Sequence, residues 1–237
     1  MGEKNPKNKD IDALSKISKD RNRTNLLKKY EQPLLAYLVQ RIPSWVSSNM
    51  LTVTGFVGSL IIMGSFISAK FFDRYWLLLG VLGLVINWFG DSLDGRVAYY
   101  RNKSRKWYGF SLDFTVDWIS NIITGFAYII YVTGYPKMLG YCFVVLYGWA
   151  MIMALLRYKI VDKYTIDSGF LGPTEVRFVI AFMLILEVFV EGSIVYYGAI
   201  ICIVLFIVNI IDFGKLLKMA DERDIEERRI KENNLID

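Results

Sequence analysis

Residues 90–117 read GDSLDGRVAYYRNKSRKWYGFSLDFTVD and place four aspartates beside or inside long apolar runs. The four are Asp91, Asp94, Asp113 and Asp117. A charged side chain at membrane depth costs roughly 3 kcal/mol, so such residues usually mark a functional site. The i, i+3 and i, i+4 spacings put each pair on one face of a helix. Converging carboxylates repel one another unless a cation lies between them, and hard divalent ions prefer oxygen ligands. The stretch therefore predicts a divalent-cation site.

The composition is that of a membrane protein. The chain has 237 residues, of which 54% are hydrophobic, and a mean hydropathy of +0.34. It contains no histidine, which excludes Ser-His and Cys-His nucleophilic sites and imidazole-bound metals. The two cysteines, Cys142 and Cys202, lie in apolar runs and are expected to be free, packed thiols. The net charge of +5 reflects basic residues at the ends of apolar segments, so no nucleic-acid partner is expected.

The apolar segments predict an all-α integral membrane protein with six transmembrane helices, preceded by an N-terminal amphipathic helix at the membrane interface. Each segment is long enough to cross about 30 Å of hydrocarbon. The predicted spans are near 51–71, 75–98, 112–133, 138–157, 171–190 and 193–213. Glu187 and Glu191, near the end of the fifth span, are expected to be wetted interface residues.

Four regions follow from this pattern. They are a polar N-terminal segment (1–24), the interfacial amphipathic helix and a turn (25–48), a six-helix transmembrane catalytic domain (49–213) and a charged cytoplasmic tail (214–237). The tail is expected to form a solvated helix over residues 221–232.

Basic residues set the predicted orientation. They concentrate in the N-terminal region, in the 99–111 and 157–177 loops and at the start of the tail, all on one side of a six-span protein. The positive-inside rule then places both termini, and the ends of the two aspartate-bearing helices, in the cytoplasm.

Small and basic residues surround the aspartates. Gly95 follows Asp94 directly and Ala98 lies about one turn further, so a ligand can approach the backbone closely. The loop from Arg101 to Lys106 adds positive charge above the carboxylates. Metal ions together with Lys and Arg side chains suit a phosphate or diphosphate substrate, and a second ion would serve both ends of a phosphoryl displacement.

These residues resemble the signature of the CDP-alcohol phosphotransferases, D-x2-D-G-x2-A-R-x8-G-x3-D-x3-D. All its fixed positions except the arginine are present: Asp91, Asp94, Gly95, Ala98, Gly109, Asp113 and Asp117. Tyr99 stands in place of the arginine, and the spacing from Ala98 to Gly109 is one residue longer than in the signature. Arg101 is therefore expected to fill the role of the missing arginine. Asn49-Met50-Leu51-Thr52 also resembles the Asn-x-Leu-Thr element of the family, and 172–177 (GPTEVR) resembles a segment of some members.

The resemblance implies a membrane-bound transferase with cytoplasmic termini and a cytoplasmic active site, often a homodimer. It implies two ions, Mg²⁺ or Mn²⁺, held by the four aspartates, and a CDP-linked donor whose phosphorus is attacked by an acceptor hydroxyl as CMP leaves. One of the two substrates is a lipid, and Asp117 is the expected base. The implied nucleotide-binding residues are Asn49, Thr52, Gly95, Ala98, Arg101 and Gly109. Arg105, Arg157 and Arg177 are candidates for binding the acceptor or a phosphate.

Other interpretations stay open. The aspartates could form salt bridges within a helix bundle, Arg157 and Arg177 could reflect topology alone, and Asn49 or Thr52 could cap a helix. A divalent-cation transporter or channel is the alternative function, although clustering of the acids at one helix end argues against a transport path. The sequence leaves the donor and acceptor undetermined, and the compact domain favours a prokaryotic source and its cytoplasmic membrane.

Overall fold

The computed structural model describes residues 28–161 and 173–233. All the regular structure in these two ranges is helical, as the sequence predicts. The predicted polar segment 1–24 and the start of the predicted interfacial helix lie outside the described residues.

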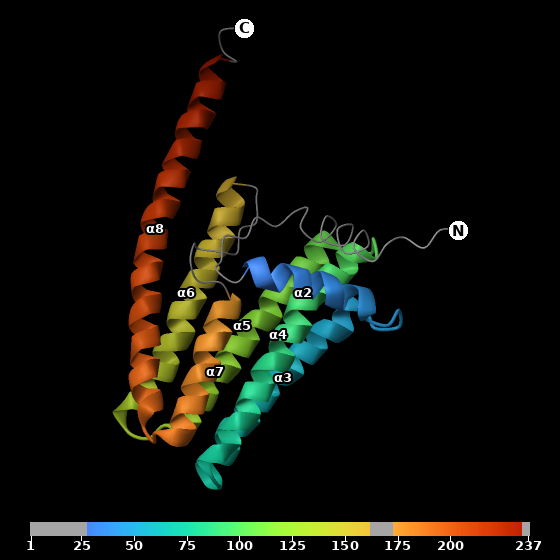
Figure 1. The fold of residues 1–237 in the computed structure, drawn as a ribbon. Helices are drawn as coiled ribbons and strands as arrows, with labels where there is room; N and C mark the ends of the chain where they lie inside the picture. Colours follow the sequence, from blue (N-terminus) through green and yellow to red (C-terminus); the bar gives the residue numbers. More distant parts are fainter. Residues whose placement is uncertain (1–27, 162–172, 234–237) are drawn as a thin grey trace, which may run out of the picture.

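The long helices match the predicted segments one for one (Figure 1). Two single-turn 3-10 helices, η1 (Arg74–Trp76) and η2 (Tyr135–Lys137), precede α4 and α6. The long helices are α2 (Lys28–Arg41), α3 (Ser48–Phe71), α4 (Leu77–Tyr100), α5 (Lys106–Tyr131), α6 (Met138–Val161), α7 (Pro173–Phe189) and α8 (Ser193–Asn233).

Within residues 28–161 and 173–233, four helical segments are long and apolar enough to cross a membrane: 48–71, 74–100, 135–161 and 193–233. They correspond to α3, η1 with α4, η2 with α6, and α8. The other two predicted spans correspond to α5, which carries two of the aspartates, and to α7, whose described part has 17 residues. For these two helices a membrane crossing stays a prediction.

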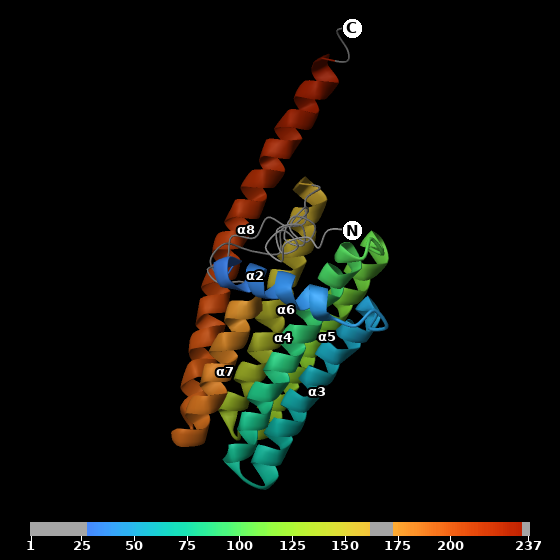
Figure 2. The same ribbon diagram turned by 45° about the vertical axis from the view of Figure 1, so that its right-hand side comes forward.

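Helix α2 lies across the end of the bundle rather than along it (Figure 2). Its buried Leu35 and Val39 join an apolar cluster with Leu51, Leu93 and Val97 of α3 and α4. The helix ends at Arg41, ahead of a turn that is followed by the start of α3. A helix is therefore present inside the predicted interval, and its amphipathic, interfacial character stays a prediction.

Glycines bring α3 and α4 together at short range, as expected for small residues in membrane helices. A Cβ atom added to Gly90 would overlap the backbone of Gly55 and the carbonyl of Leu51. One added to Gly83 would lie 2.8 Å from the carbonyl oxygen of Gly58. This close crossing fixes the position of the aspartate-bearing end of α4 along the axis of α3.

Glu187 corrects one prediction from the sequence. It is 2% exposed rather than wetted, and it lies where the chain turns from α7 into α8. Its carboxylate accepts hydrogen bonds from the backbone N–H groups of Gly192 (3.0 Å) and Ile194 (2.8 Å), and from the hydroxyls of Ser193 and Tyr131. The first N–H groups of a helix lack partners within the helix and carry partial positive charge, so a carboxylate there is stabilised. Glu191 is exposed as predicted, and pairs with Arg74.

Helix α8 runs from the bundle into the charged tail without a break (Figure 1). The predicted tail helix over 221–232 is therefore confirmed, and its residues are mostly exposed. Arg223 donates to the carbonyl oxygens of Lys159 (2.8 Å) and Ile160 at the end of α6. Cys142 of α6 and Cys202 of α8 are both free thiols, as predicted, but only Cys202 is buried, whereas Cys142 is exposed rather than packed.

Candidate active site

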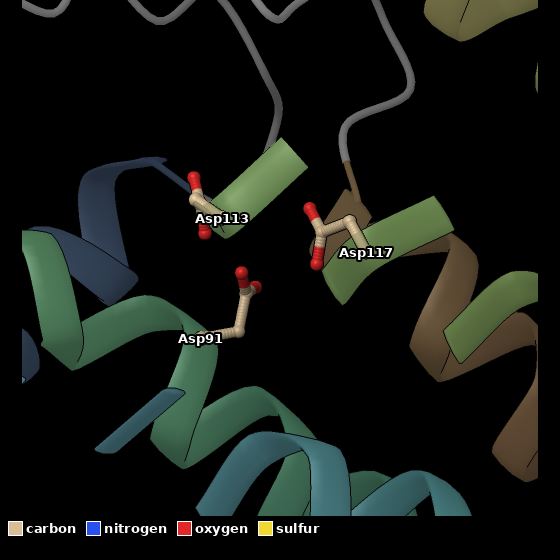
Figure 3. A group of neighbouring side chains, drawn as sticks. All are labelled: Asp91, Asp113 and Asp117. Atoms are coloured by element: carbon tan, nitrogen blue, oxygen red, sulfur yellow. The ribbon is translucent and has the colours of Figure 1, made fainter. Parts of the chain in front are cut away.

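Three of the four aspartates converge. Asp91 comes from α4, and Asp113 and Asp117 come from successive turns of α5 (Figure 3). One carboxylate oxygen from each lies within 4.8 Å of the other two, and all three residues are half-buried. Two ligands on opposite sides of an octahedral Mg²⁺ are about 4 Å apart, so the cluster fits a divalent ion with little movement. The predicted metal role of these residues is compatible with this geometry.

Asp94 turns toward α3 instead of joining that group. Its Oδ2 accepts a 2.7 Å hydrogen bond from the hydroxyl of Thr52, and its Oδ1 accepts from the backbone N–H of Gly95. Thr52 does not cap its helix: Ser47 does, by accepting from the N–H of Met50. The Thr52–Asp94 bond therefore ties α3 to α4 beside the cluster, and the metal role of Asp94 stays a prediction.

Arg177 of α7 reaches into the same site. Its Nη2 lies 2.7 Å from Oδ2 of Asp91, and its Nε donates to Oδ1 of Asn87 at 2.8 Å. Asn87 in turn donates to the carbonyl oxygen of Gly55 and to the hydroxyl of Ser59, both at 3.0 Å. A chain of polar contacts therefore runs from α3 through α4 to α7. The sequence analysis did not predict a role for Asn87. Its polar amide lies within an apolar run, four residues before Asp91 on the same helix face, and this position could have indicated that it belongs to the site.

Tyr147 of α6 is a second residue that the sequence did not reveal. Its hydroxyl makes a side-chain hydrogen bond with Asn121, and it lies close enough to Asp117, Asp91 and Arg177 to interact with them electrostatically. Asn121 also donates to the backbone carbonyl of Asp117 at 2.8 Å. Helices α4, α5, α6 and α7 thus each contribute a side chain to the neighbourhood of the carboxylates.

One of the predicted nucleotide-binding residues, Gly109, borders an open region at the start of α5. Gly109 lies two turns before Asp117 on α5, is exposed, and has nothing within 4 Å of where a Cβ would stand. Gly95 and Ala98 are half-buried on the face of α4 that carries Asp91. This arrangement leaves room for a ligand next to the carboxylates, and the assignment to a nucleotide stays a prediction.

Asn49 and Arg105 meet on the exposed side of this region. Arg105 donates to Oδ1 of Asn49 at 3.1 Å, and Asn49 donates to the hydroxyl of Tyr108 at 3.2 Å. The Arg105 guanidinium also stacks 3.8 Å from the Tyr108 ring centroid. The three side chains join the N-terminal ends of α3 and α5 above the site.

Two of the predicted ligand-binding arginines have protein partners of their own. Arg101 donates to the carbonyl oxygens of Ile42 and Pro43, both at 2.9 Å, and to that of Val46, all in the turn between α2 and α3. Arg157 forms a buried ion pair with Asp212 of α8 at 3.0 Å. These contacts secure the turn and the α6–α8 pair, and the predicted roles of both residues in ligand binding remain untested.

Comparison with known proteins agrees with the resemblance in the sequence. The profile of the family "CDP-alcohol phosphatidyltransferase" matches residues 45–211, which include every helix that contributes to the site. The chain belongs to the CDP-alcohol phosphatidyltransferase family. Its similarity extends to cholinephosphotransferase 1 of Gallus gallus, with 29% identity over 179 residues, or 70% of this chain. The chain spans about half the length of that relative, since the match covers 50% of it.

Proposed function

We propose that this integral membrane protein catalyses the metal-dependent transfer of a phospho-alcohol group from a CDP-linked donor to a hydroxyl acceptor, with release of CMP, in phospholipid biosynthesis. The observation that carries the proposal is the convergence of Asp91, Asp113 and Asp117, with oxygens within 4.8 Å of one another. Membership of the family supports the reaction class.

The chemistry assigns separate tasks to these residues. Asp91, Asp113 and Asp117 would hold Mg²⁺ or Mn²⁺, with Asp94 as the fourth ligand of a two-ion site. Bound ions supply Lewis-acid stabilisation of the charge on the diphosphate oxygens. Asp117 takes the proton from the acceptor hydroxyl. The acceptor oxygen forms a new bond to the phosphorus that carries the alcohol group, and the bond from that phosphorus to CMP breaks.

Arg177 has a position suited to phosphate binding. Its guanidinium lies against Asp91, at the edge of the predicted metal site, and its five N–H donors fit a phosphate as well as a carboxylate. A bound ion would take over the neutralisation of Asp91 and free Arg177 for a phosphate oxygen. This arrangement supports Arg177 as a phosphate ligand more directly than Arg157, which is paired with Asp212.

The name of the chicken relative suggests which substrate carries the lipid. A cholinephosphotransferase transfers phosphocholine, so we infer that the donor here is a soluble CDP-linked headgroup and that the acceptor is a lipid hydroxyl. Homodimer formation, a cytoplasmic active site and the prokaryotic cytoplasmic membrane belong to the same proposal.

A cation transporter or channel is not favoured. Among the described residues, the other buried acids with named partners are engaged elsewhere. Glu187 binds the start of α8, Asp212 pairs with Arg157, and Glu31 accepts from Thr174 and Trp88. These acids do not extend the carboxylate cluster into a path across the bundle.

The test is CMP release by purified protein in nanodiscs. CDP-choline and CDP-ethanolamine are supplied with diacylglycerol, and CDP-diacylglycerol is supplied with soluble alcohols, each with Mg²⁺, Mn²⁺ or EDTA. Asp117→Asn is compared with Asp224→Asn, a change on the exposed tail. We expect metal-dependent CMP release from one substrate pair, lost in Asp117→Asn and kept in Asp224→Asn. Folded protein that releases no CMP with any pair, or an active Asp117→Asn variant, would contradict the proposal.

A further inference from the structure

Helix α6 approaches α5 closely beside the carboxylate cluster. Gly148 packs against the indole of Trp118, and a Cβ there would lie 2.6 Å from the ring. Trp118 directly follows Asp117 on α5. A larger residue at position 148 would push α6 away, so the glycine sets the distance at which its neighbour Tyr147 stands from the site.

On one side, Tyr147 faces the proposed catalytic residues. Its hydroxyl bonds to Asn121, one turn below Asp117 on the same face of α5, and Asn121 donates to the Asp117 carbonyl oxygen. The carboxylates of Asp117 and Asp91 and the Arg177 guanidinium are its charged neighbours. The phenol therefore stands between the polar site and the part of the bundle further from the α2 end.

On its other side, Tyr147 packs against a residue that lines an apolar cavity. Its ring packs on that of Phe143, with centroids 5.8 Å apart, and Phe143 lines a cavity of about 40 Å³. Thr124 and Gly125, the next turn of α5 beyond Asn121, line it as well. Such a space is large enough for a small group, and its apolar lining favours an apolar occupant over water.

We propose that Tyr147 is a positioning residue that hydrogen-bonds the polar end of the lipid substrate at the junction between the carboxylate site and the apolar cavity, which takes part of its hydrocarbon chain. The inference rests on the proposed function and deepens it. A lipid that reacts at Asp117 must place its polar end near the carboxylates and its chains among apolar side chains. Tyr147, with a polar tip and an apolar ring that continues into Phe143, matches both requirements.

The occupant is the lipid substrate and not the nucleotide. The exposed region around Gly109, Asn49 and Arg105 lies on the far side of the carboxylates, toward the N-terminal end of α5. Tyr147 and Asn121 lie on the other side, toward the cavity. Changes at Tyr147 should therefore act on the lipid and spare the soluble, nucleotide-bearing substrate.

The test uses Tyr147→Phe in nanodiscs, with Tyr141→Phe as the control on an exposed position of the same helix. The KM for the lipid, varied as a mole fraction of the bilayer, and the KM for the soluble substrate are measured with the active pair. We expect Tyr147→Phe to raise the lipid KM about tenfold, as for a lost hydrogen bond of roughly 1.4 kcal/mol, and to leave the soluble-substrate KM within about twofold. Tyr141→Phe should behave as wild type.

A second variant tests the cavity side. Phe143→Leu keeps an apolar residue there and should change the preference among lipids of different chain length or unsaturation, whereas Tyr147→Phe should not. Unchanged lipid KM in Tyr147→Phe, or an equal rise for both substrates, would overturn the inference while leaving an active wild type and the proposed function intact. An inactive wild type would instead remove the proposed function itself.

Discussion

The Nη2 atom of Arg177 lies 2.7 Å from Oδ2 of Asp91, although the two residues are 86 positions apart in the chain. The pair joins α7 to the carboxylate cluster formed by α4 and α5, and it is mostly buried. A cation from the protein therefore already offsets part of the charge that a divalent ion would neutralise. This relationship makes the stability of the protein and its affinity for metal dependent on each other.

Replacing Arg177 should consequently cost more stability without metal than with it. Arg177→Gln removes a hydrogen bond and ion pair to Asp91, and we expect a loss of about 1–3 kcal/mol of stability in EDTA. With saturating Mg²⁺ the ion compensates Asp91, and the loss should shrink. Thermal unfolding in detergent, with and without Mg²⁺, measures this difference. Arg105→Gln, at an exposed position, serves as the control, and an equal loss for Arg177→Gln in both conditions would contradict the argument.

The Arg157–Asp212 pair allows a structural role to be separated from ligand binding. Removing one partner of a buried ion pair leaves an uncompensated charge and costs about 3–5 kcal/mol, whereas replacing both by apolar residues is often neutral. We expect Arg157→Met and Asp212→Leu each to lower thermal stability, and the double variant to recover most of it. If the pair is only structural, the double variant also keeps the KM values of wild type. A raised KM in a stable double variant would show that Arg157 binds a substrate.

Glu187 should govern stability without affecting catalysis. In Glu187→Gln an amide NH₂ replaces one oxygen that accepts hydrogen bonds at the start of α8. A loss of about 1–3 kcal/mol follows, or a fall of roughly 3–10 °C in apparent Tm. Glu191→Gln, with an exposed carboxylate, should leave Tm unchanged. Activity per folded molecule, measured well below Tm, should match wild type, and a selective loss of activity in Glu187→Gln would be inconsistent with a capping role.

The α3–α4 crossing should be intolerant of a single added methyl group. Gly90→Ala forces the two backbones apart, because the new Cβ overlaps Gly55 and Leu51. It should also move Asp91, the next residue, out of the carboxylate cluster. We expect a large loss of folded protein, with weakened Mn²⁺ binding in whatever folds. Gly64→Ala is the matched control on α3, since nothing lies within 4 Å of its added Cβ. Normal yield and Mn²⁺ affinity in Gly90→Ala would refute the packing argument.

Local pattern was sufficient to locate the helices. Apolar runs separated by polar and basic loops predicted seven helical segments, and the structure has a helix at each of them. The spacing of the aspartates predicted which pairs share a helix face, and Asp113 and Asp117 do converge. The same reasoning failed at Glu187, because its distance from the end of an apolar run says nothing about the turn that folds back over it.

The sequence by itself determined the helical membrane architecture, the family signature and the identity of the candidate metal ligands, because hydropathy and residue spacing are local properties of the chain. Only the tertiary structure decided which charges meet. Asp94 bonds to Thr52 rather than joining the other three aspartates, Arg177 pairs with Asp91, and Tyr147 stands between the carboxylates and an apolar cavity. These contacts depend on which helices pack together and at what height. Glycine crossings and interhelical hydrogen bonds set that packing, and neither has a periodic signal in the sequence.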